Sequence, residues 1–132
     1  MASIKTYKDI VAWQRSRELL LLVYELIKKL PADEKYGLSS QMKRSAVSIS
    51  SNIAEGFARN SVKESKRFYN IAKASLEELK SQFQICFDLE YLGKEDSDKV
   101  VDLMDYVGAL IYKWSNSQEK NLNNSRASKT VN

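Results

Sequence analysis

Apolar residues recur three and four positions apart in four successive segments of this chain, which is the period of an amphipathic helix. The clearest case is the segment from Tyr36 to Arg59. Its apolar set is Leu38, Met42, Ala46, Ile49, Ile53 and Phe57, and its opposite stripe is Arg44, Ser48, Ser51, Glu55 and Arg59. We therefore expect a helix with one buried face, whose polar stripe is either a site or a plain solvent surface.

Helix-ending and helix-capping residues frame the first two segments. Thr6 or Asp9 can cap a first helix, and Pro31 ends it because the residue before a proline is pushed out of the α region. Ser39 or Ser40 is then expected to cap the second helix. The apolar face of the first helix is wider than one neighbour requires. This width indicates either a central position in a bundle or a second interface with another subunit.

The third and fourth segments have their own boundary signals. Ser61 and Glu64 have the spacing of a capping box, so a third helix is expected from Val62 to about residue 92. Gly93 fits the position just after the end of that helix. The acidic residues that follow suit the positive end of a fourth helix. The fourth apolar stripe is expected to be Val100, Leu103, Val107, Leu110 and Trp114, backed by Met104 and Ile111.

Composition supports an all-helical fold. The chain of 132 residues contains only four glycines and one proline, few for a β-rich fold with many tight turns. We predict an all-α, up-down-up-down antiparallel four-helix bundle, with residues 1–117 as a single domain. The last residues are polar with few apolar side chains to bury. Residues 118–132 are therefore expected to form a disordered tail.

The sequence offers little for catalysis. It contains one cysteine and no histidine, which argues against a metal cluster and removes the Ser-His and Cys-His nucleophile pairs. We expect no enzyme activity and no cofactor. Cys86 lies on an apolar stripe and is expected to be a small buried hydrophobe. Since no segment is apolar enough for a signal peptide or a membrane span, a cytoplasmic protein without membrane contact is expected.

A set of irregularly spaced residues resembles a known family. These residues are Ile10 to Gln14, Pro31, Glu34, Tyr36 to Leu38, Gln41, Arg44, Ala46, Ser48, Ile49, Asn52 to Gly56, Phe68, Ile71, Ala72, Ser75, Glu78, Leu79 and Gln82. In this pattern the chain resembles the bacterial four-helix bundle proteins known as 23S rRNA intervening sequence proteins, over about residues 7–92. It departs at Ala74, where glycine is common, and at Lys43, where arginine is usual.

The resemblance implies an assembly and possible partners. Members of the family are expected to form antiparallel four-helix bundles that assemble into a ring, most often a homopentamer. A related group resembles the accessory proteins of diversity-generating retroelements, which form basic pentameric barrels that bind nucleic acid and a reverse transcriptase. The partners that the resemblance implies are further copies of this chain, RNA or DNA, and a protein such as a reverse transcriptase.

Basic residues near the second and third helices are candidates for nucleic-acid binding. The chain carries a net charge of +4, with the excess in its N-terminal half. The candidate phosphate contacts are Lys43, Arg44, Arg59, Lys63, Lys66 and Arg67. The same residues could equally form a solvated helix face. The alternative function is a protein–protein interaction module that does not bind nucleic acid.

A second group of residues is expected to hold the bundle or its assembly together. The group is Trp13, Gln41, Ser48, Asn52, Glu55 and Gly56. The polar members could hydrogen-bond across helices or subunits, since buried polar groups need partners. Gly56 either permits a close helix crossing or marks the end of the second helix, because glycine costs about 1 kcal/mol relative to alanine inside a helix.

Overall fold

Every regular element that the structure describes is a helix. The computed structural model describes residues 3–131, with side chains described as far as residue 118. The elements are η1 (Tyr7–Asp9), α1 (Val11–Ile27), η2 (Ala32–Glu34), α2 (Leu38–Phe57), α3 (Val62–Asp88) and α4 (Lys94–Val131), of which the two η elements are short 3-10 turns. The predicted all-α class is confirmed.

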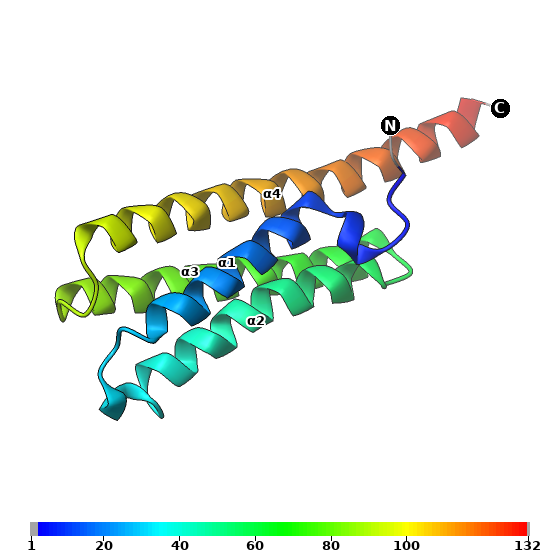
Figure 1. The fold of residues 1–132 in the computed structure, drawn as a ribbon. Coiled ribbons are helices and arrows are strands. Elements are labelled where there is room, and N and C mark those ends of the chain that lie inside the picture. Colours follow the sequence, from blue (N-terminus) through cyan, green and yellow to red (C-terminus); the bar gives the residue numbers. More distant parts are fainter. Residues whose placement is uncertain (1–2, 132) are drawn as a thin grey trace.

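The four long helices form one bundle (Figure 1). The α1–α2 and α3–α4 links lie at one end, and the α2–α3 link lies at the other end beside the N-terminal segment. Successive helices therefore run in opposite directions. Helix α1 packs against α2 and α4, and α3 packs against the same two helices, with the most extensive contact between α2 and α3. This last contact positions most of the candidate residues.

The core lies along the axis of the bundle, where the helices turn their apolar stripes inward. In α2, Met42, Ala46, Ile49 and Ile53 are fully buried, as predicted. In α4 the predicted apolar residues all reach the core, but to different depths: Val100, Met104, Val107 and Ile111 are buried, whereas Leu103, Leu110 and Trp114 are only partly buried. Leu19, Val23, Ala72, Leu79 and Phe83 complete much of the core from α1 and α3.

The helix starts agree only in part with the expected caps. Ser61 caps α3 as predicted, because its hydroxyl accepts a hydrogen bond from the backbone N–H of Glu64 at 3.2 Å. Thr6 and Asp9 form a capping box, but around η1 rather than at the start of α1. Neither Ser39 nor Ser40 caps α2, since both lie inside the helix, whose N-cap is the preceding glycine.

The end of α3 is earlier than predicted and is built differently. The helix stops at Asp88, and Glu90 takes the left-handed conformation, with φ of 60°. The Glu90 N–H bonds the Phe87 carbonyl at 3.0 Å and the Tyr91 N–H bonds the Cys86 carbonyl at 2.9 Å, which together make a Schellman motif. Glu90 thus occupies the position expected for Gly93. Gly93 instead precedes α4, and its carbonyl accepts a bond from the Ser97 N–H.

The disordered tail expected over residues 118–132 stays a prediction, and Asn132 lies outside the described residues. Helix α4 continues through residue 118 as far as Val131 and projects past the other helices in Figure 1. A helix that already has a packed first half gains one hydrogen bond for each further residue fixed, so even a polar sequence can extend it.

Candidate nucleic-acid and assembly surfaces

A polar seam runs between the buried faces of α2 and α3. The Ser48 and Ser75 hydroxyls lie 2.8 Å apart across the two helices. The Asn52 side-chain amide donates to the Ser48 carbonyl at 2.8 Å and to the Ser48 hydroxyl at 3.1 Å. Each of these polar groups is partly buried and has a partner, as burial requires. Ser48 therefore makes a cross-helix contact within a single chain. Asn52 bonds only to Ser48 of its own helix, so a cross-helix role of Asn52 stays a prediction.

The positions that flank this seam carry charged and amide side chains with few partners among the residues that the structure describes. Gln41 and Arg44 of α2 are exposed, and Arg44 forms no ion pair with any residue that the structure describes. On α3, the Gln82 amide donates to Glu78 at a long 3.4 Å, and the buried Gln82 Oε1 finds no donor among the described residues. Glu78 is exposed and lacks a cationic partner over the same range.

Gly56 allows α2 and α3 to approach closely. A Cβ atom at this position would lie 2.3 Å from Cε1 and 2.8 Å from Cδ1 of Tyr69, which is itself buried. The Tyr69 ring also meets Trp114 of α4 edge to face, with ring centroids 6.5 Å apart. Of the two roles predicted for Gly56, the structure shows the close crossing, placed in the last turn of α2. Helical periodicity could not have identified Tyr69 as the opposing group.

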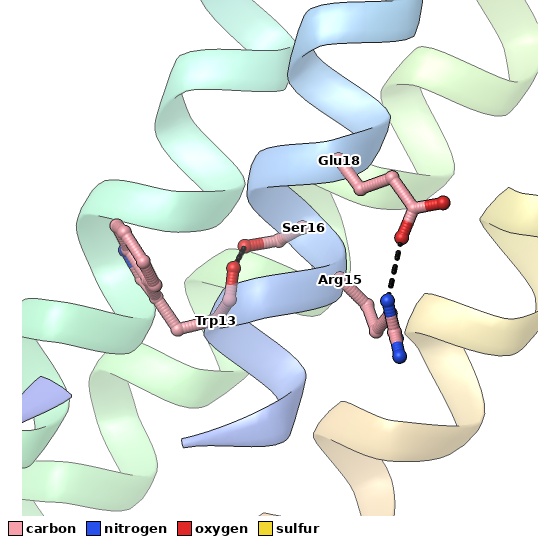
Figure 2. Close-up of polar contacts among 4 residues, drawn as sticks. All are labelled: Trp13, Arg15, Ser16 and Glu18. Carbon is pink, nitrogen blue, oxygen red and sulfur yellow. Dashed lines mark hydrogen bonds and ion pairs between the residues drawn. The ribbon is translucent and has the colours of Figure 1, made fainter. Parts of the chain in front are cut away.

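Trp13 lies on the side of α1 that faces α2 (Figure 2). The Ser16 hydroxyl donates to the Trp13 carbonyl at 2.8 Å and lies 3.0 Å from the Ser50 hydroxyl of α2. Because the Ser16 proton goes to that carbonyl, Ser50 is the donor between the two helices. The Arg15–Glu18 ion pair, 2.9 Å long, lies on the opposite side of α1 and faces α4 in Figure 2.

A groove follows the α1–α2 side of the bundle. Its volume is about 560 Å³. The walls are aromatic and apolar, from Tyr7, Trp13 and Leu20, and α2 supplies a floor of small residues that includes Val47 and Ala54. Tyr7 and Trp13 pack edge to face, with ring centroids 4.9 Å apart. The wide apolar face of α1 is thus partly open to solvent along this groove.

Three of the predicted phosphate contacts gather where α2 ends and α3 begins, a group that we call the basic corner: Arg59, Lys63 and Arg67. The Arg59 guanidinium lies 4.6 Å and the Arg67 guanidinium 5.9 Å from the ring centroid of Phe68. Lys63 is exposed one helical turn before Arg67. Arg59, which lies just beyond the end of α2, also pairs with Glu55 of that helix. Sequence reasoning missed Phe68 as the platform that holds the two arginines.

The other predicted phosphate contacts are placed elsewhere. Lys43 lies sixteen positions before Arg59 on α2, about 24 Å away along a helix. Its ammonium sits 5.3 Å from the ring centroid of Tyr24 of α1, with Arg44 next to it. Lys66 is half-buried near the basic corner. The six predicted cations therefore form two separate groups rather than one surface.

The two ends of the bundle differ in charge. The end with the basic corner and the N-terminal segment, residues 5–9 and 55–67, carries six lysines and arginines against three acidic residues. The opposite end, residues 28–37 and 88–99, carries five lysines against seven acidic residues. A polyanion would therefore be attracted to the end with the basic corner.

The last features to consider are the single cysteine, metal binding and membrane-spanning segments. Cys86 is buried beside Met42, and the two sulfur atoms lie 3.6 Å apart. Burial raises the pKa of the Cys86 thiol to about 11, with a smaller contribution from the negative charge of Glu34. In the part of the chain that the structure describes, no three His, Cys, Asp or Glu side chains gather as a metal site. Over the same residues no helix is long and apolar enough to span a membrane.

Comparisons with known proteins agree with the fold. Residues 8–113 match the family described as 23S rRNA-intervening sequence protein. The chain is also similar to the crystal structure of a Bacteroides thetaiotaomicron protein of unknown function from the S23 ribosomal protein family. That similarity has a TM-score of 0.75 and 24% identity, and it covers 83% of this chain and 98% of the other. No curated protein matches the chain significantly.

Proposed function

Because the chain belongs to the 23S rRNA-intervening sequence protein family, we propose that it is a non-enzymatic scaffold that assembles with copies of itself and binds nucleic acid through the basic corner. The assembly is a ring, most simply a homopentamer, as the family resemblance implies. The observation that carries the nucleic-acid part of the proposal is the pairing of Arg59 and Arg67 on Phe68.

The basic corner has the chemistry of a phosphate-binding surface. Stacking on Phe68 restricts the two guanidinium groups before any ligand arrives, so less side-chain entropy is lost when they bind phosphate. Lys63 adds an exposed ammonium on the same side of α3. Because these groups are exposed on the surface, they would contact the backbone of a nucleic acid rather than read its bases.

Assembly would strengthen this weak, sequence-independent contact. A single basic corner offers only a few phosphate contacts, and non-specific binding of this kind is salt-sensitive. Several corners joined in one assembly act on the same strand, which raises the apparent affinity without any new contact. The proposal contains no catalytic step, because the sequence has no histidine and a single buried cysteine.

The test uses fluorescence anisotropy with a labelled single-stranded RNA, and with the DNA of the same sequence, over a series of salt concentrations. Lys63→Ala and Arg67→Ala should each weaken binding and each reduce the slope of log K against log salt by about 0.7 per lost contact. Lys99→Ala is the control, since Lys99 is equally exposed but lies at the acidic end. Binding that is absent, or that is reduced as much by the control, would refute the nucleic-acid part.

A second function is favoured by the α1–α2 groove. Its volume of about 560 Å³ and its aromatic wall suit the apolar face of a helix from another protein, such as a reverse transcriptase. This would make the chain a protein–protein interaction module without nucleic-acid binding. Ala54→Arg in the floor of the groove should then abolish capture of the partner while the two basic-corner variants leave it unchanged.

A further inference from the structure

The outward faces of α2 and α3 carry exposed apolar and charged side chains in matching order. On α2 the stripe consists of Arg44, Val47, Ser51 and Glu55, and Val47 keeps 41% of its surface exposed. On α3 the stripe consists of Arg67, Ile71, Ala74 and Glu78, and Ile71 keeps 40% exposed. The spacings of three and four keep each stripe on one side of its helix.

The charges at the ends of the two stripes have the same spacing. Arg44 and Glu55 are eleven positions apart on α2, and Arg67 and Glu78 are eleven positions apart on α3. Eleven residues are about three helical turns, or roughly 16 Å. Each stripe begins with its cation and ends with its carboxylate. Laid antiparallel against each other, the two stripes therefore place each cation opposite a carboxylate, with the apolar and small residues between.

We propose that these two stripes are the self-assembly interface, in which the α2 stripe of one copy docks antiparallel on the α3 stripe of the next. The proposal rests on the self-assembly proposed above and names its surface. Its central contact joins Arg44 of one copy to Glu78 of its neighbour. Both side chains are exposed, and neither has an ion-pair partner within the part of its own chain that the structure describes. Glu55 and Arg67 lie opposite each other at the edge of the contact, where each is already held by a neighbour in its own chain and Arg67 keeps its place in the exposed basic corner.

The geometry favours a closed assembly. Within one chain α3 runs antiparallel to α2 (Figure 1), so an antiparallel contact between α2 and the next copy's α3 keeps the two bundle axes parallel. Because the contact joins two different surfaces, it is heterologous, and repeating it generates a ring when the rotation closes. Parallel axes also place the basic corners of all copies on one rim. The same contact therefore explains how a single strand could meet several corners.

The test reverses each charge and measures the mass of the assembly by light scattering over a dilution series. Arg44→Glu and Glu78→Arg should each raise the concentration at which the assembly dissociates by about tenfold or more, because each places like charges opposite one another. The controls are Arg17→Glu on α1 and Asp102→Arg on α4, which make the same reversals at exposed positions outside the two stripes. Circular dichroism checks that all variants keep the helical content of the parent.

Mixing the two singly reversed proteins distinguishes pairing between copies from pairing within one chain. If the contact joins copies, the new carboxylate of the Arg44→Glu protein meets the new guanidinium of the Glu78→Arg protein, and the mixture forms complexes that contain both. If the pair forms within a chain, each variant keeps its own repulsion and mixing restores nothing, which would overturn the inference. A parent assembly that neither reversal weakens would also overturn it, while leaving the proposed scaffold intact. A monomeric parent would instead refute the self-assembly proposed above.

Discussion

Replacing Gly56 with alanine tests whether the α2–α3 crossing depends on the absence of a side chain. The added Cβ would lie 2.3 Å, 2.8 Å and 2.9 Å from three ring carbons of Tyr69. Carbon atoms pack best at about 3.5–4.0 Å, so the ring must move or the helices must separate. Tyr69 has little room to move, because it is buried and packs against Trp114.

Two opposing effects determine how much Gly56→Ala changes the free energy of unfolding. Overpacking a filled core costs up to about 3 kcal/mol, and contacts this short place the substitution near that upper value. Alanine is favoured over glycine inside a helix by about 1 kcal/mol, which offsets part of the cost. We therefore expect Gly56→Ala to lower the free energy of unfolding by about 2 kcal/mol.

The assay is urea unfolding followed by circular dichroism, with all variants at one protein concentration because assembly would also contribute to stability. Gly108→Ala in α4 is the matched control, since its Cβ would meet only the end of the Leu76 side chain at 3.2 Å. The double variant Gly56→Ala/Tyr69→Leu lacks the ring that the added Cβ would meet. Its loss in free energy of unfolding should therefore be smaller than the sum of the losses in the two single variants. If Gly56→Ala is as stable as Gly108→Ala, the close crossing does not constrain the fold and the reasoning fails.

Two further predictions concern the end of α3 and the single cysteine. Glu90→Gly should raise the free energy of unfolding by about 1 kcal/mol, because Glu90 holds the left-handed conformation that costs a side chain roughly that amount; an unchanged urea midpoint would contradict it. Cys86 should resist alkylation by a maleimide at pH 8 in the native protein, because burial raises the pKa of its thiol to about 11 and keeps it protonated there. Rapid labelling without denaturant would contradict the burial of this thiol.

Features set by local sequence were predictable. The apolar stripe of α2 and the Ser61 cap follow from spacings of three and four residues, and both are confirmed. The depth of burial within the apolar face of α4 was not predictable, because two adjacent rows satisfy the same period and only the neighbouring helices decide which row is buried more deeply. The end of α3 was assigned to Gly93 since glycine is the usual residue there, whereas the structure uses Glu90.

The candidate surfaces depend on contacts between helices, which a helical wheel does not contain. Ser48 was identified as a cross-helix group, but its partner Ser75 lies 27 positions away. The six predicted cations form one set in the sequence because they lie near one another along the chain. In the structure the length of α2 separates Lys43 from Arg59. The Lys43 ammonium instead lies over the ring of Tyr24 of α1. Phe68, the platform of the basic corner, read only as one more apolar position.

The mass of the purified protein in solution shows whether the chain assembles with copies of itself. Native mass spectrometry, supported by light scattering across a dilution series, would measure it without any label or ligand. The account predicts a closed assembly, most simply five copies of the 15.1 kDa chain, that persists on dilution better than the charge-reversed variants. A plain monomer at all concentrations would contradict the scaffold, the shared rim of basic corners and the paired stripes together.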